Sequence, residues 1–148
     1  MAAPDFMGIA LAEAKAAAEA GEVPVGCVIA RDGEVLAKAG NRTLRDRDPT
    51  AHAEVLALRA AARKISSERL IGCDLYVTLE PCTMCAAAIS FARIRRLYFG
   101  ASDPKGGAVE SGVRFFNVPT CHHKPEVYGG IGGVEASTLL KEFFAAKR

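Results

Sequence analysis

The residues best suited to metal chemistry in this sequence lie between Thr50 and Cys85. His52 opens the group, Glu54 follows it by two residues, and Cys82 and Cys85 close it. One imidazole and two thiols are ligands that zinc prefers. Catalytic zinc sites take three protein ligands and leave a fourth position to water, whereas structural sites take four. The three ligands and the nearby carboxylate therefore predict a catalytic zinc site.

The spacing of His52 and Glu54 indicates that both lie at the start of a helix. Residues two apart in a regular helix point about 200° away from each other, so the two side chains can share a target only beyond the end of the helix axis. Pro49 and Thr50 favour a helix start at this point, because proline suits the first helical position and threonine caps well. We therefore expect His52 and Glu54 in the first turn.

The second half of the group has a similar design. Pro81 again suits a helix start, and the three-residue separation of Cys82 and Cys85 puts both thiols on one face of that helix. The positive end of a helix dipole favours the thiolate form of a cysteine near it. We therefore expect two helix starts to converge on one cation, whose charge balance is restored by the two thiolates.

Length and composition limit what else the chain can be. Its 148 residues are enough for one domain with a real core, half of them are hydrophobic, and the formal net charge is only +2. This mildly basic charge does not by itself argue for a nucleic-acid partner. No stretch looks like a signal peptide or is long enough to span a membrane. Five cysteines, an odd number, fit a reducing compartment, so we expect a single soluble, cytoplasmic domain over residues 1–148.

Hydrophobic periodicity and turn signals predict an α/β fold that positions these ligands. The hairpin at Asp32-Gly33 predicts an antiparallel edge, and the later strands, separated by helices, predict parallel neighbours. The expected helices cover residues 5–20, 49–65, 82–92, 110–116 and 135–147, and the expected strands cover residues 23–30, 35–39, 74–79, 96–101 and 127–128.

At His52-Ala53-Glu54 and Pro81-Cys82-Thr83-Met84-Cys85 the sequence resembles the zinc-dependent cytidine and deoxycytidylate deaminase superfamily. Flanking segments such as Glu22–Gly26 and Asp48–Glu54 make it most similar to the bacterial branch that deaminates adenosine in tRNA. The resemblance runs from about Ala10 to Phe144. It implies a cytidine-deaminase-like three-layer α/β/α sandwich around a mixed five-stranded sheet, and a homodimer.

The resemblance also implies a reaction. His52, Cys82 and Cys85 would hold one Zn²⁺ per subunit, which lowers the pKa of a bound water to about 7. The resulting hydroxide would attack C6 of adenine at the wobble position of a tRNA anticodon stem-loop. Glu54 would carry the proton first to N1 and then to the departing ammonia, which leaves inosine.

By the same resemblance the substrate-binding residues would include Asn41, Ala53, Asp103 and Lys105. The mix of cations and aromatic residues near the C-terminus adds Phe144, which could stack on single-stranded RNA. The residues alone leave simpler readings open, because Asn41 also suits a turn and Phe144 also suits the apolar stripe of a terminal helix. The segment at residues 108–124 departs from the pattern of the better-known members, which bears on the RNA contacts more than on the chemistry. We expect no membrane or DNA partner.

Two alternatives share the same motifs. The first is a small-molecule deaminase of the same superfamily, acting on guanine, cytosine or a deoxycytidylate. The second is a zinc-stabilised binding module without activity, which needs a fourth protein ligand, and Cys121, His122 and His123 are the candidates for it. Ammonia release from free bases would favour the first alternative, and zinc without an exchangeable water would favour the second.

Overall fold

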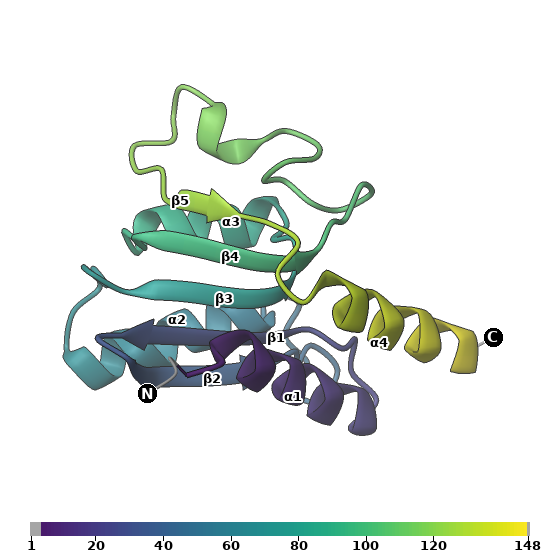
Figure 1. Ribbon diagram of the computed structural model, residues 1–148. Helices are drawn as coiled ribbons and strands as arrows, with labels where there is room; N and C mark the ends of the chain where they lie inside the picture. Colours follow the sequence, from purple (N-terminus) through teal and green to yellow (C-terminus); the bar gives the residue numbers. More distant parts are fainter. Residues whose placement is uncertain (1–3, 148) are drawn as a thin grey trace.

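A computed structural model describes residues 4–147 of the chain (Figure 1). The elements in chain order are α1 (Phe6–Glu19), β1 (Gly26–Arg31), β2 (Glu34–Gly40), α2 (Ala53–Ile65), β3 (Asp74–Leu79), α3 (Thr83–Phe91), β4 (Arg96–Ala101), the 3-10 helix η1 (Phe115–Asn117), β5 (Glu126–Tyr128) and α4 (Gly133–Ala146).

The five strands form one mixed sheet in the order β2-β1-β3-β4-β5. β1 pairs antiparallel with both β2 and β3, whereas β3, β4 and β5 run parallel to one another. Asp32 and Gly33 both have positive φ angles, as a tight hairpin between β1 and β2 requires. The predicted antiparallel edge and parallel neighbours are therefore confirmed.

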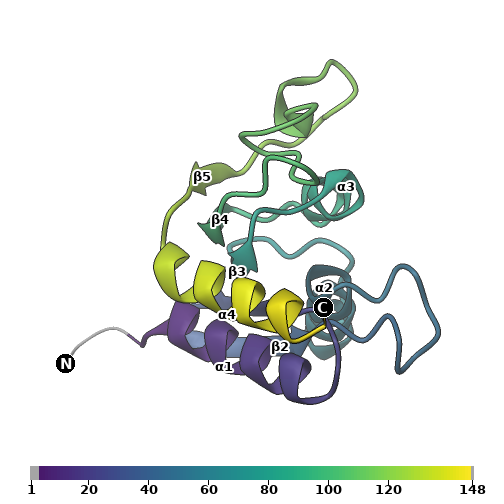
Figure 2. The ribbon, with the colours of Figure 1, turned by 90° about the vertical axis from the view of Figure 1, so that its right-hand side faces the viewer.

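Helices cover both faces of this sheet. Figure 2 shows α1 and α4 side by side on one face and α2 and α3 on the other. The main hydrophobic core lies between the sheet and the α2–α3 layer and includes Leu75, Val77, Ile89, Leu97 and Phe99. The predicted three-layer α/β/α sandwich is confirmed. No helix within residues 4–147 is long and apolar enough to cross a membrane.

Small residues bring α1 close to the sheet. The face of α1 toward the sheet carries Ala10, Ala14 and Ala17, which are almost fully buried. A β-carbon at Gly26 would overlap the backbone oxygen of Ala10 and lie 2.6 Å from the backbone nitrogen of Ala14. Only glycine fits there, and this close packing fixes the beginning of β1, where the chain enters the sheet next to the end of β3.

The predicted start of the second helix was wrong by several residues. α2 begins at Ala53, and His52 is its N-cap residue in an extended conformation. The side chain of Asp48 accepts hydrogen bonds from the backbone nitrogen and the hydroxyl of Thr50, so residues 48–51 form a turn of their own. His52 therefore lies just outside the helix, and Glu54 lies in its first turn.

Other boundaries also differ. β1 begins at Gly26, because Val23–Val25 forms a tight turn in which the Val25 N–H donates to the Val23 carbonyl. The short helix predicted over residues 110–116 is absent, and in this part of the chain only the 3-10 helix Phe115–Asn117 is helical. Gly112 and Arg114 both have positive φ angles, which interrupt a right-handed helix, and the backbone N–H groups of residues 109–111 donate to the side chain of Glu80.

The 4-3-4-3 spacing of Ala51, Val55, Leu58, Ala62 and Ile65 predicts the apolar stripe of the second helix, but the buried side of α2 differs from it in part. Its fully buried residues are Ala53, Glu54, Ala57, Leu58 and Ala61, whereas Val55, Ala62 and Ile65 are only partly buried. Alanines let the helix approach the sheet closely, which leaves the larger apolar residues toward the edge of the layer.

Candidate active site

A pocket of about 270 Å³ opens at the carboxyl end of β3, where the antiparallel and parallel parts of the sheet meet. Parallel sheets commonly place their sites at this kind of position, beyond the strand ends. The helices α2 and α3 both begin here. The pocket is lined by Val23, Val25, Asn41, Thr43, His52, Glu54, Leu79, Glu80, Cys82, Asp103 and Gly106.

The three predicted metal ligands converge at the base of this pocket. His52 and Cys82 are the N-cap residues of α2 and α3, and Cys85 lies in the first turn of α3. The His52 Nδ1 atom lies 3.7 Å from the sulfur of Cys82 and 3.5 Å from that of Cys85. In a tetrahedral zinc site, bonds of about 2.0–2.1 Å to nitrogen and about 2.3 Å to sulfur put these atoms about 3.6 Å apart.

The donor set therefore fits zinc in both chemistry and spacing. No other His, Cys, Asp or Glu within residues 4–147 joins the three ligands in one cluster. Three protein ligands without a fourth are the arrangement of a catalytic zinc site rather than a structural one.

The electrostatics of the ligands suit a cation. A hydrogen bond from the Cys85 thiol, with a second contribution from His52, lowers the pKa of Cys82 to about 4. The contact with Cys82 and burial raise the pKa of Cys85, and the contact with Cys82 raises the pKa of His52. The lowered pKa favours the thiolate form of Cys82, and a metal ion that binds there displaces the proton of Cys85.

Glu54 is the buried carboxylate of the pocket. Its side chain is 4% exposed, and burial raises its pKa to about 7. A cation on the neighbouring ligands would favour the ionised form. A carboxyl group that can gain or lose a proton near neutral pH is suited to proton transfer.

Two of the five predicted substrate-binding residues line the pocket, namely Asn41 and Asp103. The Asn41 Oδ1 atom accepts a hydrogen bond of 2.8 Å from the Ala53 backbone N–H, which supplies the cap that His52 does not provide for α2. Ala53 is fully buried, and its backbone N–H is already used in this hydrogen bond to Asn41. Lys105 and Phe144 lie outside the pocket lining, and Phe144 is 47% exposed on α4.

The Cys121-His122-His123 sequence belongs to a different part of the molecule. The Ser90 hydroxyl on α3 donates to the His123 carbonyl at 2.7 Å and contacts the Cys121 sulfur at 3.5 Å. The His123 Nε2 atom lies 2.7 Å from the Ile94 carbonyl oxygen. These contacts fasten the segment before β5 to the end of α3, and the segment provides no fourth ligand to the zinc group.

Sequence reasoning missed two buried carboxylates that hold the walls of the pocket. Glu22 accepts hydrogen bonds from the backbone of Leu44 and from the backbone and guanidinium of Arg45, which fixes the loop after β2. Glu80 accepts five hydrogen bonds from the segment after β4. Each is a charged residue beside a run of apolar strand residues, and this position was the one feature of the sequence that could have indicated a buried carboxylate.

The chain belongs to the zinc-dependent cytidine and deoxycytidylate deaminase family, because residues 2–101 match the cytidine and deoxycytidylate deaminase zinc-binding region. A more specific likeness is to the tRNA-specific adenosine deaminase of Agrobacterium fabrum, which is 62% identical over 97% of this chain and 94% of that protein. The tRNA-specific adenosine deaminase of Aquifex aeolicus is 48% identical over 97% of this chain and 94% of its own length.

Solved structures agree with this placement. One comes from biochemical and structural studies of A-to-I editing by tRNA:A34 deaminases at the wobble position of transfer RNA. It has a TM-score of 0.90 and 63% identity, and covers 91% of this chain and 98% of that one. A guanine deaminase from Nitrosomonas europaea has a TM-score of 0.83 and 26% identity, and covers 98% of this chain and 86% of that one.

Proposed function

We propose that this chain hydrolyses adenosine to inosine at the wobble position of tRNA, as one deaminase domain over residues 1–148. The observation that carries the proposal is the 62% identity to a tRNA-specific adenosine deaminase over nearly the whole chain, together with a three-ligand site and a carboxylate in one pocket. The guanine deaminase structure shares the fold at much lower identity, so it supports the class of chemistry more than the substrate.

His52, Cys82 and Cys85 would hold the zinc ion, which when bound activates a water molecule for attack on carbon C6 of the base. The Glu54 carboxylate accepts a proton from that water and delivers it to N1. It then moves the second proton to the exocyclic amino group, the C6–N bond breaks, and ammonia leaves. The six-membered ring keeps the oxygen, and the product is inosine. Burial of Glu54 keeps both proton transfers away from bulk water.

The rest of the pocket supports binding of a flipped base. Val23, Val25 and Leu79 supply apolar surface beside the polar groups of Asn41 and Asp103. A pocket of this size admits one base, so the target adenosine must leave the stack of the anticodon loop. Lys105 and Phe144 lie outside the pocket lining, so in this proposal they contact flanking nucleotides rather than the target base.

A homodimer is part of the proposal. A mostly apolar hollow between α2 and α3 is lined by Val55, Leu58, Ala62, Ala88, Phe91 and Ala92, with Arg59 and Glu68. Phe91 is 75% exposed, and an exposed aromatic side chain beside apolar surface is typical of a protein interface. A second copy of the chain on this face would bury Phe91. A tRNA substrate also implies a cytoplasmic location.

The experiment that tests the proposal is a substrate panel. Pure zinc-loaded protein is incubated with an anticodon stem-loop carrying adenosine at the wobble position, with the same stem-loop carrying adenosine elsewhere in the loop, and with free adenosine, guanine and cytosine. Inosine from the first substrate alone is the expected result. Ammonia release from guanine or cytosine, with no inosine in RNA, would instead identify a small-molecule deaminase.

A further inference from the structure

The carboxylate of Glu80 is the most heavily hydrogen-bonded side chain of the described residues. It is 2% exposed and directly precedes Pro81 and the zinc ligand Cys82. Its Oε1 atom accepts from the Asp103 backbone N–H at 2.9 Å and from the Ser111 hydroxyl at 3.0 Å. Its Oε2 atom accepts from three consecutive backbone N–H groups, those of Val109, Glu110 and Ser111, at 2.9–3.1 Å.

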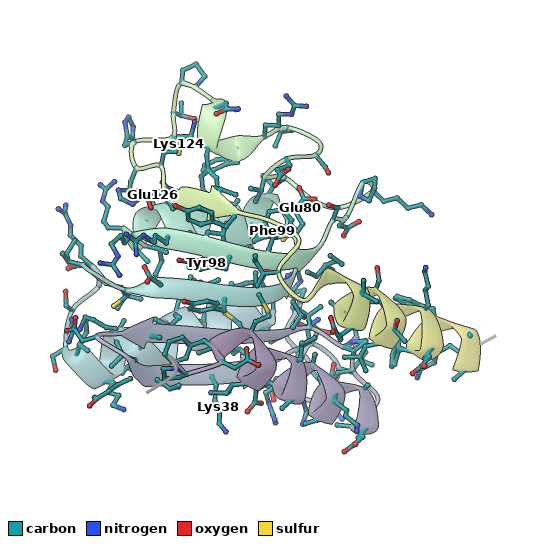
Figure 3. All side chains as sticks on the ribbon, viewed as in Figure 1. Lys38, Glu80, Tyr98, Phe99, Lys124 and Glu126 are labelled. Atoms are coloured by element: carbon teal, nitrogen blue, oxygen red, sulfur yellow. The ribbon has the colours of Figure 1, made fainter. Side chains whose placement is uncertain are left out.

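These donors lie at both ends of one segment, residues 103–111, which follows β4. Figure 3 shows Glu80 at the end of the sheet, next to this segment. The segment has no helix or strand of its own, so hydrogen bonds to Glu80 and short backbone turns hold its shape. Its residues Asp103 and Gly106 form one wall of the pocket that contains His52 and Glu54.

Gly107 shows how closely the segment packs on the carboxylate. A β-carbon at this position would lie 2.5 Å from Cδ and 2.7 Å from Oε1 of Glu80, and 2.5 Å from the backbone oxygen of Asp103. The neighbouring Ala108 N–H donates to the carbonyl of Pro81 at 2.9 Å. Glu80 and Pro81, which precede the zinc ligand Cys82, are therefore in contact with the pocket wall at several atoms, most of them around the Glu80 side chain.

We propose that Glu80 is a positioning residue for the substrate, which sets the distance between the pocket wall at Asp103–Gly106 and the zinc ligands. This inference rests on the proposed function, because it assigns that wall to binding of the RNA substrate. Glu80 lies in the pocket lining, but both of its carboxylate oxygens accept hydrogen bonds from residues 103–111. It acts by holding the backbone of the wall in one conformation, so that the substrate meets a formed pocket.

The test compares Glu80→Gln with Glu34→Gln in zinc-loaded protein. Glutamine keeps the size of glutamate, but its NH₂ group must face at least one backbone N–H of residues 103 or 109–111. Glu34 is an exposed residue at the β1–β2 hairpin, at the opposite end of these strands from the pocket residues Val25 and Asn41, so it controls for loss of one negative charge. Gly107→Ala disturbs the same contact from the opposite side and leaves the carboxylate in place.

We expect Glu80→Gln and Gly107→Ala to raise KM for the stem-loop by roughly 10- to 100-fold, the loss that follows from one broken hydrogen bond to a charged group. The change in kcat should be smaller, and zinc should stay at one ion per chain, because the metal ligands are unchanged. Amide hydrogen exchange at residues 109–111 should become at least roughly tenfold faster in Glu80→Gln, since the donors lose a charged acceptor. Glu34→Gln should match the unmodified chain in every measurement.

An unchanged KM in zinc-loaded Glu80→Gln and Gly107→Ala would overturn the proposal, and so would a loss of activity that only follows a loss of zinc. If Glu80→Gln does not fold, Gly107→Ala alone decides the outcome. Amide exchange needs no substrate. If the unmodified chain makes no inosine, the proposed function has failed. Unchanged amide exchange at residues 109–111 in Glu80→Gln would instead refute the role of Glu80 in holding the pocket wall.

Discussion

Asn41 has two side-chain hydrogen-bonding groups, and the oxygen already has a partner inside the protein. Its Oδ1 atom caps α2 through the Ala53 N–H at 2.8 Å, and its side chain lines the pocket beside His52 and Glu54. Substitution by Ala removes both groups. Substitution by Asp keeps an acceptor for the helix and replaces the amide donor with a second oxygen. The two variants therefore separate helix stabilisation from substrate binding.

Loss of a helix cap costs about 0.5–2 kcal/mol, typically about 1. For a chain of 148 residues, 1 kcal/mol lowers Tm by roughly 2–4 °C. We expect Asn41→Ala to show this decrease in calorimetry of the zinc-loaded protein. Asn41→Asp should stay within about 1 °C of the unmodified chain, because a carboxylate also caps well and suits a helix N-terminus.

Both variants should raise KM in the stem-loop assay if the amide NH₂ of Asn41 donates to the substrate, since both variants lack that donor. A lost hydrogen bond of about 0.5–1.5 kcal/mol predicts an increase of roughly 2- to 12-fold. An Asn41→Asp protein as unstable as Asn41→Ala would refute the capping role. An Asn41→Asp protein with unchanged KM would show that the donor does not touch the substrate, and Asn41 would then be only a turn and cap residue.

Two further variants test other parts of the account. Burial raises the pKa of Glu22, but the hydrogen bonds from Arg45 and Leu44 outweigh it and hold the pKa below its usual value. The stabilisation is therefore complete above the usual glutamate pKa of about 4.3 and is lost as the pH falls through the lower folded-state value. Urea unfolding is measured between pH 3 and 7 at intervals of about one pH unit. The free energy of unfolding should fall more steeply at acid pH for the unmodified chain than for Glu22→Gln, and equal slopes would contradict the role of Glu22. Phe91→Glu should convert the proposed dimer to a monomer in analytical ultracentrifugation, because a charge cannot be buried unpaired in that interface, and a dimer that survives the change would place the interface elsewhere.

The convergence of the three candidate metal ligands and the order of elements could be predicted from sequence, because each depends on short-range patterns. The hairpin at Asp32-Gly33 and the strand at Asp74–Leu79 were both found where their residues indicated. The ligands His52, Cys82 and Cys85 are separated by many residues, but the two motifs lie at the starts of α2 and α3, which the sheet brings together.

What could not be predicted depends on long-range hydrogen bonds. The N-cap position of His52 follows from the turn at Asp48 and from Asn41. The Asn41 side chain accepts a hydrogen bond from the N–H of Ala53, 12 residues later in the chain. The helix predicted near residue 110 is interrupted by the positive φ angles of Gly112 and Arg114, in a segment whose N–H groups bond to Glu80, 29–31 residues earlier in the chain. A helical pattern in that segment competes with a buried carboxylate, and nothing in the local sequence reveals that the carboxylate is there.

The most direct test of the account is deamination of the stem-loop by Glu54→Gln at full zinc occupancy. If Glu54 moves both protons, this variant should bind one zinc ion per chain and fold like the unmodified protein, because His52, Cys82 and Cys85 are intact. Its kcat should fall by at least roughly 100-fold, the usual contribution of a general acid–base group. A zinc-loaded Glu54→Gln protein that makes inosine at the normal rate would contradict the assignment of the pocket as a zinc-dependent deaminase site.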